Sequence, residues 1–451
     1  MQATPVILIF DIGKTNKKLL LLDEDYQLVH EVATQFNEII DDDGFACEDL
    51  NKLTNWVLVE FQNLLTNNAF EIKAVNFSGY GASFVYLDEL GKPLLPLYNY
   101  LKPYPPALSE QFYKTYGGES MLAKQTASPV LGSLNSGLQL YRIKYEKPAI
   151  YNQIKYALHL PQYLSFILTK TYHTDLTSIG CHTHLWDFQN SCYHHWVNKE
   201  GIDSKFAPIK NSDSIAGTIN DGIQVGVGLH DSSAALIPYL VSFTEPFVLL
   251  STGTWCITLH PFNHTILSDY ELHQDCLCYL SYKGLPIKAS RLFAGYEHEQ
   301  QVKKLAAHFN QPIDYYKTVA FDTALLTPPK KIAKTTKKIT GEIMLQQSAF
   351  SARQLSDFAN YEAAYHRLIA DIIDQQTKST NLVLSGSMVQ NIFVDGGFSS
   401  NPVYMNLLAA AFPNNKVSAA SVPQASAIGA ALAIHPYWNT KPFPTNLIQV
   451  Q

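Results

Sequence analysis

The sequence predicts an α/β protein of two domains with a cleft between them. Three observations lead to this fold class. The chain has 451 residues, which is more than a single hydrophobic core usually holds. Short apolar runs typical of buried strands alternate with segments whose apolar residues recur at helical spacing. Two similar strand–turn–strand signals, near residues 11 and 251, indicate that the core is duplicated.

The composition is that of an ordinary globular protein. Hydrophobic residues make up 46% of the chain and charged residues 16%, which argues against disorder. The formal net charge of −6 gives no basic footprint, so we expect no nucleic-acid partner. No apolar run approaches the roughly 20 residues that span a bilayer, and the first apolar run is typical of a strand rather than a signal peptide. These features predict a cytoplasmic protein without membrane contact.

The first strand signal is the apolar run from Val6 to Phe10. A second apolar run, Leu19 to Leu22, follows after the polar turn Asp11-Ile12-Gly13-Lys14-Thr15-Asn16-Lys17-Lys18. The pattern predicts a β-hairpin whose tip offers backbone N–H groups, a hydroxyl and Lys cations to an anion. The turn is not a P-loop, because that motif needs a further glycine five positions earlier and a helix afterwards. Asp11 is a candidate to hold Mg²⁺ through water, and an ordinary solvated turn is the alternative.

The next segments alternate between helix and strand. Residues 49–65 carry apolar side chains at helical spacing, and residues 73–78 predict a strand that runs into Gly79-Tyr80-Gly81-Ala82-Ser83. The acidic run at residues 41–43 is predicted to be a solvated loop. Residues 97–106 are rich in Tyr, Asn and Pro, so they form either a rigid loop that lines a sugar pocket or plain surface structure.

The chain is organised around residues 226–255. The first part is a run of small and apolar residues that suits a helix start or a tight turn and contains the adjacent pair His230 and Asp231. The apolar strand Phe247 to Leu250 follows and breaks into Ser251-Thr252-Gly253-Thr254-Trp255. Hydroxyls and a flexible glycine just past a strand offer N–H groups to an anion. An acid/base candidate therefore lies about twenty residues before a second anion cradle.

Cysteine, histidine and lysine clusters are predicted to be structural. The six cysteines form no C-x-x-C pair, which favours free buried thiols in a reducing compartment over a metal site. Four histidines surround Trp186 and Asp187 without an acidic or Cys partner at helical ligand spacing, namely His182, His184, His194 and His195. The basic run at residues 330–338 is predicted to be a solvated loop.

The C-terminal part predicts a strand end at which a flat ligand can approach the backbone. Residues 361–372 predict an amphipathic helix. The strand Ile392 to Val394 ends in Asp395-Gly396-Gly397-Phe398-Ser399-Ser400-Asn401-Pro402, where Ser or Asn before Pro is typical of a helix start. Paired glycines at a strand end let a flat ligand approach the backbone. A helix at residues 403–412 and a run of small residues at 425–433 follow.

Three of these motifs together resemble the FGGY family of carbohydrate kinases, within the actin/hexokinase/Hsp70 superfold. The turn at residues 11–18 resembles the family's first phosphate motif, and residues 251–255 resemble the second. Residues 395–402 and the later run 424–433 resemble the adenosine motif. The resemblance covers nearly the full length and implies two RNase H-like α/β domains with a cleft between them.

The resemblance also implies domain limits and ligands. Residues 1–238 would form an N-terminal domain with the sugar site and the first phosphate turn. Residues 239–451 would form a C-terminal domain with the second phosphate turn and the adenosine site. The implied cofactors are ATP and Mg²⁺, the implied partner is a small sugar, and the implied assembly is a monomer or a homodimer.

Site residues follow from the matched motifs. Asp231 would be the general base that accepts the proton of the attacking sugar hydroxyl, and Asp11 would hold Mg²⁺ through water. ATP and its phosphates would be bound by Gly13, Lys14, Thr15, Asn16, Thr252, Gly253, Thr254, Gly396, Gly397 and Ser400. The sugar would be bound by Ala82, Ser83, Tyr98, Asn99, His230 and Asp231.

The pattern is most similar to L-rhamnulose and L-fuculose kinases, whose H-D-x-x-x-A…S-G-T-W block is matched at residues 230–235 and 252–255. An Asp and a Val of their sugar motif are replaced here by Ser83 and Ala82, and a Glu of the adenosine motif is replaced by Gln424. The expected substrate is a (6-deoxy) ketohexose such as L-rhamnulose or L-fuculose, phosphorylated at its primary hydroxyl. The alternatives are a kinase for another ketose such as xylulose, a catalytically weak sugar sensor or pseudokinase, and an Hsp70-like or actin-like ATPase.

Overall fold

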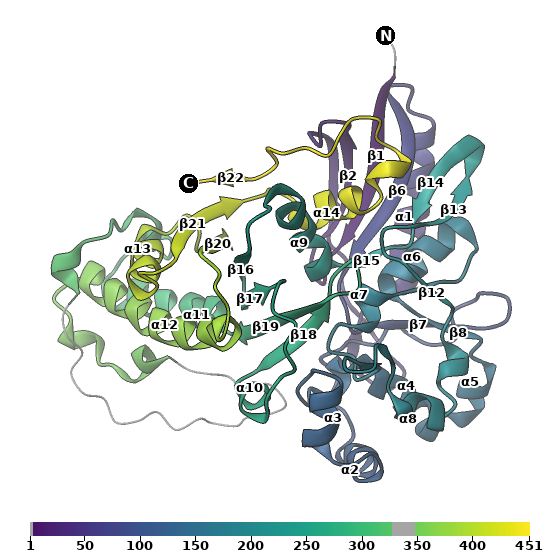
Figure 1. The fold of residues 1–451 in the computed structure, drawn as a ribbon, viewed down its shortest axis with the longest axis horizontal. Coiled ribbons are helices and arrows are strands. Elements are labelled where there is room, and N and C mark those ends of the chain that lie inside the picture. The colour runs from purple at the N-terminus through teal and green to yellow at the C-terminus, as the bar shows by residue number, and fades with distance from the viewer. Residues whose placement is uncertain (1–2, 327–347) are drawn as a thin grey trace.

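A computed structural model describes residues 3–326 and 348–451. The described residues form two halves, each built on a seven-stranded sheet with helices packed against it (Figure 1). The predicted basic loop at residues 330–338 lies outside the described residues. None of the helices in the described ranges has the length and apolar character needed to cross a membrane.

The N-terminal sheet begins with an antiparallel meander, as the hairpin signal predicts. β1 pairs with β2 and β2 with β3 in antiparallel fashion, whereas β6 runs parallel to β1 on its other side. The strand order is β13 (Ile215–Ile219), β14 (Ile223–Gly226), β6 (Phe70–Gly79), β1 (Thr4–Ile12), β2 (Lys17–Asp23) and β3 (Leu28–Thr34), with β15 (Leu229–His230) also paired to β6.

The C-terminal sheet repeats this arrangement. β16 pairs antiparallel with β17, β17 pairs antiparallel with β19, and β20 runs parallel to β16 on its other side. The strand order is β18 (Cys276–Leu280), β19 (Pro286–Leu292), β17 (Cys256–His260), β16 (Phe247–Thr252), β20 (Asn391–Gly396), β21 (Lys416–Ser421) and β22 (Gln449–Val450). The predicted duplication of the core is therefore present in the structure.

Helices cover the sheets and form a mainly helical part beside β7 and β8. The longer helices are α1 (Leu50–Leu65), α2 (Pro106–Thr115), α4 (Ser136–Glu146), α6 (Leu160–Thr169), α9 (Asp231–Ser242), α11 (Ala294–His308), α12 (Tyr361–Leu384), α13 (Pro402–Ala411) and α14 (Ala425–Ala433). The shorter elements include α3 (Glu119–Gln125), α5 (Pro148–Gln153), α7 (Leu176–Ile179), α8 (His195–Lys199), α10 (Asp269–His273), β7 (Phe84–Leu87) and β8 (Tyr156–His159).

The central strand β1 shows why the first apolar run is continuous rather than alternating. Val6, Leu8 and Phe10 point to the core formed with α1 and α6. Ile7 and Ile9 point to a second core that includes α9 and α14. Successive side chains of a strand face opposite sides of the sheet, so a sheet covered on both faces needs apolar residues at every position. The helix α1 begins where predicted, because the Asp49 side chain accepts a hydrogen bond from the Lys52 N–H at 3.0 Å.

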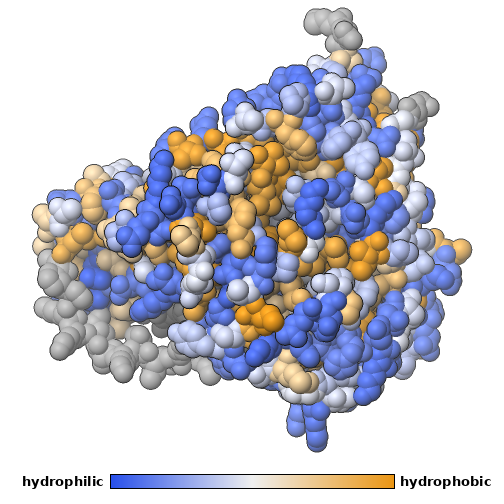
Figure 2. Space-filling model, in the orientation of Figure 1, coloured by the Kyte–Doolittle hydropathy of each residue, from blue (hydrophilic) through white to orange (hydrophobic). Residues whose placement is uncertain are grey.

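The helices α9 and α14 join the two halves (Figure 1). One buried apolar cluster contains both helices and strands of both sheets. The Asn76 side chain of β6 donates to the Ala430 carbonyl of α14 at 2.8 Å, and the Tyr239 hydroxyl of α9 donates to the Ala420 carbonyl of β21 at 3.0 Å. Each helix is thus fastened to the sheet of the other half. Figure 2 shows hydrophobic surface gathered over this junction on the face that it displays.

Candidate functional site

The first predicted anion cradle is the turn between β1 and β2, and a buried ion pair fixes its backbone. The Gly13 N–H donates to the Asn16 carbonyl at 2.9 Å. Lys17 is buried, and its ammonium donates to the Lys14 carbonyl at 3.0 Å while it forms an ion pair of 2.8 Å with the buried Glu48. A buried charge is stable only when it is paired. The Lys17–Glu48 pair therefore holds the tip of the turn in one conformation.

The side chains at the tip face outward. Thr15 and Asn16 are exposed, and the Asn16 side chain accepts a hydrogen bond from Gln35 at 2.7 Å. The Lys14 ammonium forms an ion pair of 2.5 Å with Glu38. The turn thus presents solvent-accessible polar groups on a fixed backbone, as a phosphate cradle requires.

The second predicted cradle is fastened to the glycine-rich loop after β20. The Gly397 N–H donates to the Thr252 carbonyl at 2.8 Å, and the Thr252 hydroxyl accepts from the Phe398 N–H at 3.0 Å. The turn itself is closed by a bond of 2.9 Å from the Gly253 N–H to the Trp255 carbonyl. The exposed residues Gly253 and Thr254 therefore share one rigid unit with the exposed residues Gly396, Gly397 and Ser400.

The two glycines of this loop have different surroundings. Gly396 has a φ of +85°, and a Cβ atom there would lie 2.0 Å from the Thr252 carbonyl oxygen. Gly397 has no positive φ, and a Cβ there would meet only that same oxygen, at 3.9 Å. Gly396 is thus required by the backbone, whereas Gly397 leaves open space above the loop.

The predicted general base, Asp231, is the first residue of α9. Its Oδ1 atom accepts from the Ser232 N–H at 2.6 Å and from the Ser232 hydroxyl at 3.2 Å, and it lies 3.3 Å from His230 Nε2. About a third of the side chain is exposed, with a relative accessibility of 35%. Burial raises the pKa of Asp231 to about 6, and the two bonds from Ser232 oppose that shift.

Asp11 lies near Asp231 at the end of β1. Its Oδ2 atom accepts from the Ser426 hydroxyl at 2.8 Å, and Ser426 stands in the first turn of α14. Burial raises the pKa of Asp11, hydrogen bonds from Ser426 and Ser78 lower it, and the charge of Asp231 raises it further. The structure therefore brings two carboxyl groups together from distant parts of the sequence.

One wall beside Asp231 is formed by the segment after β6. A Cβ atom on Gly81 would lie 2.8 Å from the His230 ring, so the glycine lets the backbone pack against that ring. The Ala82 carbonyl accepts from the Gln139 side chain at 2.7 Å, and Ser83 is buried with its hydroxyl 3.4 Å from the Tyr98 carbonyl. Burial lowers the pKa of His230 to about 3, so this imidazole is neutral at physiological pH.

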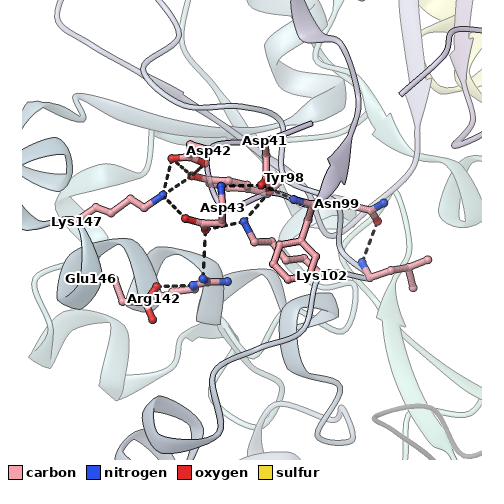
Figure 3. A network of polar contacts seen from close by, with 11 residues as sticks. Asp41, Asp42, Asp43, Tyr98, Asn99, Lys102, Arg142, Glu146 and Lys147 are labelled. Carbon is pink, nitrogen blue, oxygen red and sulfur yellow. Dashed lines mark hydrogen bonds and ion pairs between the residues drawn. The ribbon is translucent and has the colours of Figure 1, made fainter. Parts of the chain in front are cut away.

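The prediction of a solvated loop at residues 41–43 holds only in part: Asp42 and Asp43 are exposed and lie in a turn, but Asp41 is buried and the whole run is held by ion pairs. Lys102 is buried and forms ion pairs with Asp41 at 2.6 Å and with Asp43 at 2.7 Å, while Lys147 pairs with Asp42 and Asp43 (Figure 3). Burial alone would raise the pKa of Asp41 and Asp43, but the bonds and charges of these partners lower it. The cations lie 59 to 105 residues away in the sequence, so no local pattern announces them.

This polar network fixes the loop that carries Tyr98 and Asn99. The Tyr98 hydroxyl donates to Asp42 at 2.8 Å, and the Lys102 ammonium lies 4.3 Å from the centre of the Tyr98 ring (Figure 3). The Asn99 side chain donates to Glu38 at 3.3 Å. The cavity among these groups has a volume of about 20 Å³, which holds roughly one water molecule. The network therefore fixes the positions of Tyr98 and Asn99 and supports the loop that carries them.

The residues around Asp11 and the two turns fit ATP and Mg²⁺. Carboxylate and hydroxyl oxygens are the ligands that Mg²⁺ prefers, and Asp11 supplies the carboxylate at the point where both halves meet. The open face of Gly397 and the fixed turns at Gly13 and Gly253 are surfaces on which a nucleotide can lie against backbone. Lys18 donates to Gln424 at 3.1 Å and so links the first turn to the start of α14.

Family comparison agrees with this geometry. The family model of the N-terminal domain of the FGGY family of carbohydrate kinases matches residues 6–235. The model of the FGGY carbohydrate kinase C-terminal domain matches residues 244–442. The chain belongs to the FGGY family of carbohydrate kinases. The family resemblance seen in the sequence is thus confirmed, and it favours a sugar kinase over an Hsp70-like or actin-like ATPase.

Individual relatives of this FGGY chain are distant. It is 22% identical over 265 residues to a rhamnulokinase of Oceanobacillus iheyensis, covering 55% of this chain and 54% of that one. It is 21% identical over 300 residues to a xylulose kinase of Staphylococcus epidermidis, covering 59% and 58%. The FGGY chain therefore spans little more than half the length of the curated relatives it matches.

Solved structures confirm the predicted fold over nearly the whole chain. A carbohydrate kinase from Novosphingobium aromaticivorans has a TM-score of 0.81 at 23% identity and covers 99% of this chain and 94% of its own. A ligand-bound xylulose kinase from Lactobacillus acidophilus has a TM-score of 0.78 at 15% identity and covers 99% and 92%. At these identities the likeness concerns the fold alone.

Several residues of the site were not predicted from the sequence. Ser426, Ser232 and Glu38 contact predicted site residues through their side chains, and Cys181 lies against His230. Ser426 stands within a motif that the sequence singled out, so its role could have been suspected. Glu38 and Cys181 have no signal of their own, because only the fold brings them to the site.

Proposed function

We propose that this FGGY chain transfers a phosphoryl group from ATP to the primary hydroxyl of a ketose. The observation that carries this proposal is the Asp231 carboxyl, which is partly exposed, has a pKa of about 6 and lies near Asp11 at the junction of the two halves. A general base works best when its pKa is near the working pH. The predicted domain limit at residue 238 falls inside α9 and stays part of this proposal.

The chemistry needs positioning and charge neutralisation more than covalent help, because phosphoryl transfer passes through a loose transition state. Bound ATP with Mg²⁺ supplies the activated phosphoryl group. Asp231 accepts the proton of the acceptor hydroxyl, and His230, neutral at physiological pH, donates a hydrogen bond that orients that carboxylate. Backbone N–H groups near Gly13 and Gly253 would hold the phosphates, and Asp11 would hold the metal through water.

A 6-deoxyketohexose is the substrate class that we favour. The wall of the acceptor site combines backbone polar groups at Ala82 with the aromatic rings of Tyr80 and Tyr100, which lie 6.0 Å apart. Burial, followed by the charges of Asp231 and Glu38, raises the pKa of Tyr100, so this ring lies near the base. Aromatic surface suits a sugar with an apolar methyl end. Rhamnulokinases among the relatives support the same class.

Xylulose is the second candidate. Ser83 stands where the deoxyketose kinases have a carboxylate, and its hydroxyl faces the Tyr98 carbonyl. A neutral hydroxyl is a weaker acceptor than a carboxylate, since charge-assisted hydrogen bonds are roughly twice as strong. Xylulose kinases among the relatives and the solved structures make this ketose the natural comparison.

The test is a panel of ketoses and aldoses with ATP and Mg²⁺, in which both ADP release and the phosphorylated sugar are measured. The proposal predicts sugar-dependent ADP release with a deoxyketose as the best acceptor. A clear preference for xylulose would correct the substrate class and leave the kinase assignment in place. Sugar binding by calorimetry without any sugar-dependent ADP release would instead identify a sensor or pseudokinase.

Ser83→Asp is expected to change the order of preference among the sugars more than the maximal rate. The new carboxylate would accept hydrogen bonds that Ser83 cannot, and each such bond is worth about 1.5–3 kcal/mol. The measurement is the ratio of kcat/KM values between deoxyketoses and xylulose in both proteins, with Ser214→Asp, in the turn before β13, as a control. An unchanged ratio in a folded Ser83→Asp protein would remove Ser83 from the acceptor site.

A further inference from the structure

Three side chains next to the candidate base form a compact group of soft-metal ligands. Cys181 and His182 follow α7, and His230 lies on β15. All three are buried, and one ligand atom from each lies within 4.8 Å of the others. Within residues 3–326 and 348–451, no other group of three His, Cys, Asp or Glu side chains has its ligand atoms this close together. The group differs from the four-histidine cluster that the sequence singled out, of which it contains only His182.

The hydrogen bond of the His182 ring suits a metal ligand, and the His230 ring faces the same point. His182 Nδ1 lies 3.1 Å from the Leu134 carbonyl, which can only accept, so Nδ1 carries the proton and Nε2 keeps its lone pair. Metal-binding histidines are usually oriented by such a bond to a carbonyl. His230 Nε2 lies 3.1 Å from Cys181 Sγ and is the ring nitrogen that faces the group. A bound ion would replace the contact of this atom with Asp231, and the ring proton would move to the buried Nδ1 atom, which has no hydrogen-bond partner in the described part of the chain.

Several contacts hold the group in place. The His230 ring stacks on the Tyr279 ring with the two centroids 5.7 Å apart. The backbone N–H of His230 donates to the Thr177 hydroxyl at 2.9 Å. His182 has a φ of +40°, a left-handed conformation that few non-glycine residues adopt. Residues held in such conformations cluster at functional sites. The three ligands are thus fixed by the surrounding structure rather than by contact with each other alone.

The charged side chains around the group also affect whether a cation can bind there. The Asp231 carboxylate lies 3.3 Å from His230 Nε2 and favours a positive ion. The charge of Arg291 reaches Cys181 and His182, and Asp275 pairs with Arg291 at 2.6 Å, while the charge of Asp175 also reaches Cys181. The Arg291 charge is therefore largely balanced.

We propose that Cys181, His182 and His230 bind a thiophilic divalent cation of the Zn²⁺ class. A thiolate and two imidazoles select Zn²⁺ over Mg²⁺, which prefers oxygen ligands. On binding, the Cys181 thiol releases its proton to solvent as the metal–sulfur bond forms. Because His230 adjoins Asp231, and resting on the proposed kinase function, the ion also inhibits the enzyme by competing with the acceptor sugar.

The direct test uses Co²⁺ as a spectroscopic substitute for Zn²⁺, with neither sugar nor ATP present. We expect about one Co²⁺ per chain, a thiolate-to-cobalt charge-transfer band, and loss of the band when Zn²⁺ is added. Cys181→Ser and His182→Asn should each weaken Co²⁺ binding at least tenfold, while Cys192→Ser, at the exposed cysteine, should leave it unchanged. Circular dichroism checks that each variant is folded. If Cys181→Ser does not fold, Cys181→Ala is measured in its place.

The wild-type protein lacking the charge-transfer band, or folded Cys181 variants that keep it, would overturn the proposal. The inhibitory part is read separately, as the change in KM for the sugar on addition of Zn²⁺. We expect a rise in KM for the sugar with little change in KM for ATP, and a much smaller rise in Cys181→Ser. The absorption test does not depend on turnover, so it stands even if no sugar is phosphorylated.

Discussion

The Asp231 carboxyl combines a raised pKa, partial exposure and a position at the start of a helix. Burial raises its pKa, while the N–H and hydroxyl of Ser232 stabilise the ionised form. The positive end of the helix dipole also favours a negative charge in the first turn. The balance leaves a group that is ionised at neutral pH and still basic enough to accept a proton from a sugar hydroxyl.

The pH dependence of the reaction should report this pKa. A base must be deprotonated to act, so kcat/KM for the sugar should fall as the pH drops through about 6. Ser232→Ala removes a donor that lies 3.2 Å from Oδ1, which raises the pKa further and moves the acidic limb to higher pH. The measurement is kcat/KM against pH for both proteins. A limb that stays in place or moves to lower pH would show that another group controls the profile.

The two glycines after β20 separate the requirements of folding from those of binding. Gly397→Val should leave the fold intact, because a Cβ there meets only one atom, at 3.9 Å. It should weaken ATP binding roughly tenfold, which corresponds to about 1.4 kcal/mol, by filling the surface proposed for the nucleotide. Gly396→Ala should instead destabilise the protein by about 1–3 kcal/mol, since φ is +85° and the Thr252 carbonyl is in the way.

These effects are measured by calorimetric ATP titration and by denaturant unfolding of each variant. Sugar binding serves as the control, because neither glycine lies at the acceptor wall. Unchanged ATP affinity in a folded Gly397→Val protein would place the adenine elsewhere.

The first strands of both halves, several of the longer helices and both turns were predictable from the sequence because their signals are local. The run from Val6 to Phe10, the Asp49 cap and the start of α13 at Pro402 each depend on neighbouring residues alone. The contacts of the site were predicted only where a family motif marks them, as for Asp231. The ion pairs of residues 41–43 and the approach of Cys181 to His230 depend on side chains many residues apart.

The crossing of α9 and α14 ties the two halves into one unit. Gly429 of α14 lies so close to α9 that a Cβ atom would come within 1.8 Å of the Ala234 carbonyl oxygen. Asp231 is the first residue of α9, and Ser426 of α14 donates a hydrogen bond to Asp11. The distance between the two helices therefore also sets the distance between the carboxylates of Asp231 and Asp11. Neither helix shows this partnership in its own sequence, beyond an excess of small residues.

Gly429→Ala should therefore lower both stability and activity. The methyl group forces the helices apart, and overpacking of this kind costs about 1–3 kcal/mol. Gly217→Ala on the edge strand β13 is the matched control, because its Cβ would meet ordinary contacts at 3.4 Å. Thermal unfolding and sugar-dependent ADP release are measured for both. Wild-type stability in Gly429→Ala would mean that the two helices are not in the close contact described.

The most direct measurement is sugar-dependent ADP release by Asp231→Asn at neutral pH. The substitution keeps the shape of the side chain and removes its basicity, so turnover should fall by roughly 10²-fold or more. ATP affinity should stay unchanged, because the base does not hold the nucleotide. Asp25→Asn, at an exposed aspartate, should behave like the wild-type protein. Near-normal turnover in a folded Asp231→Asn protein would contradict the assignment of Asp231 as the base.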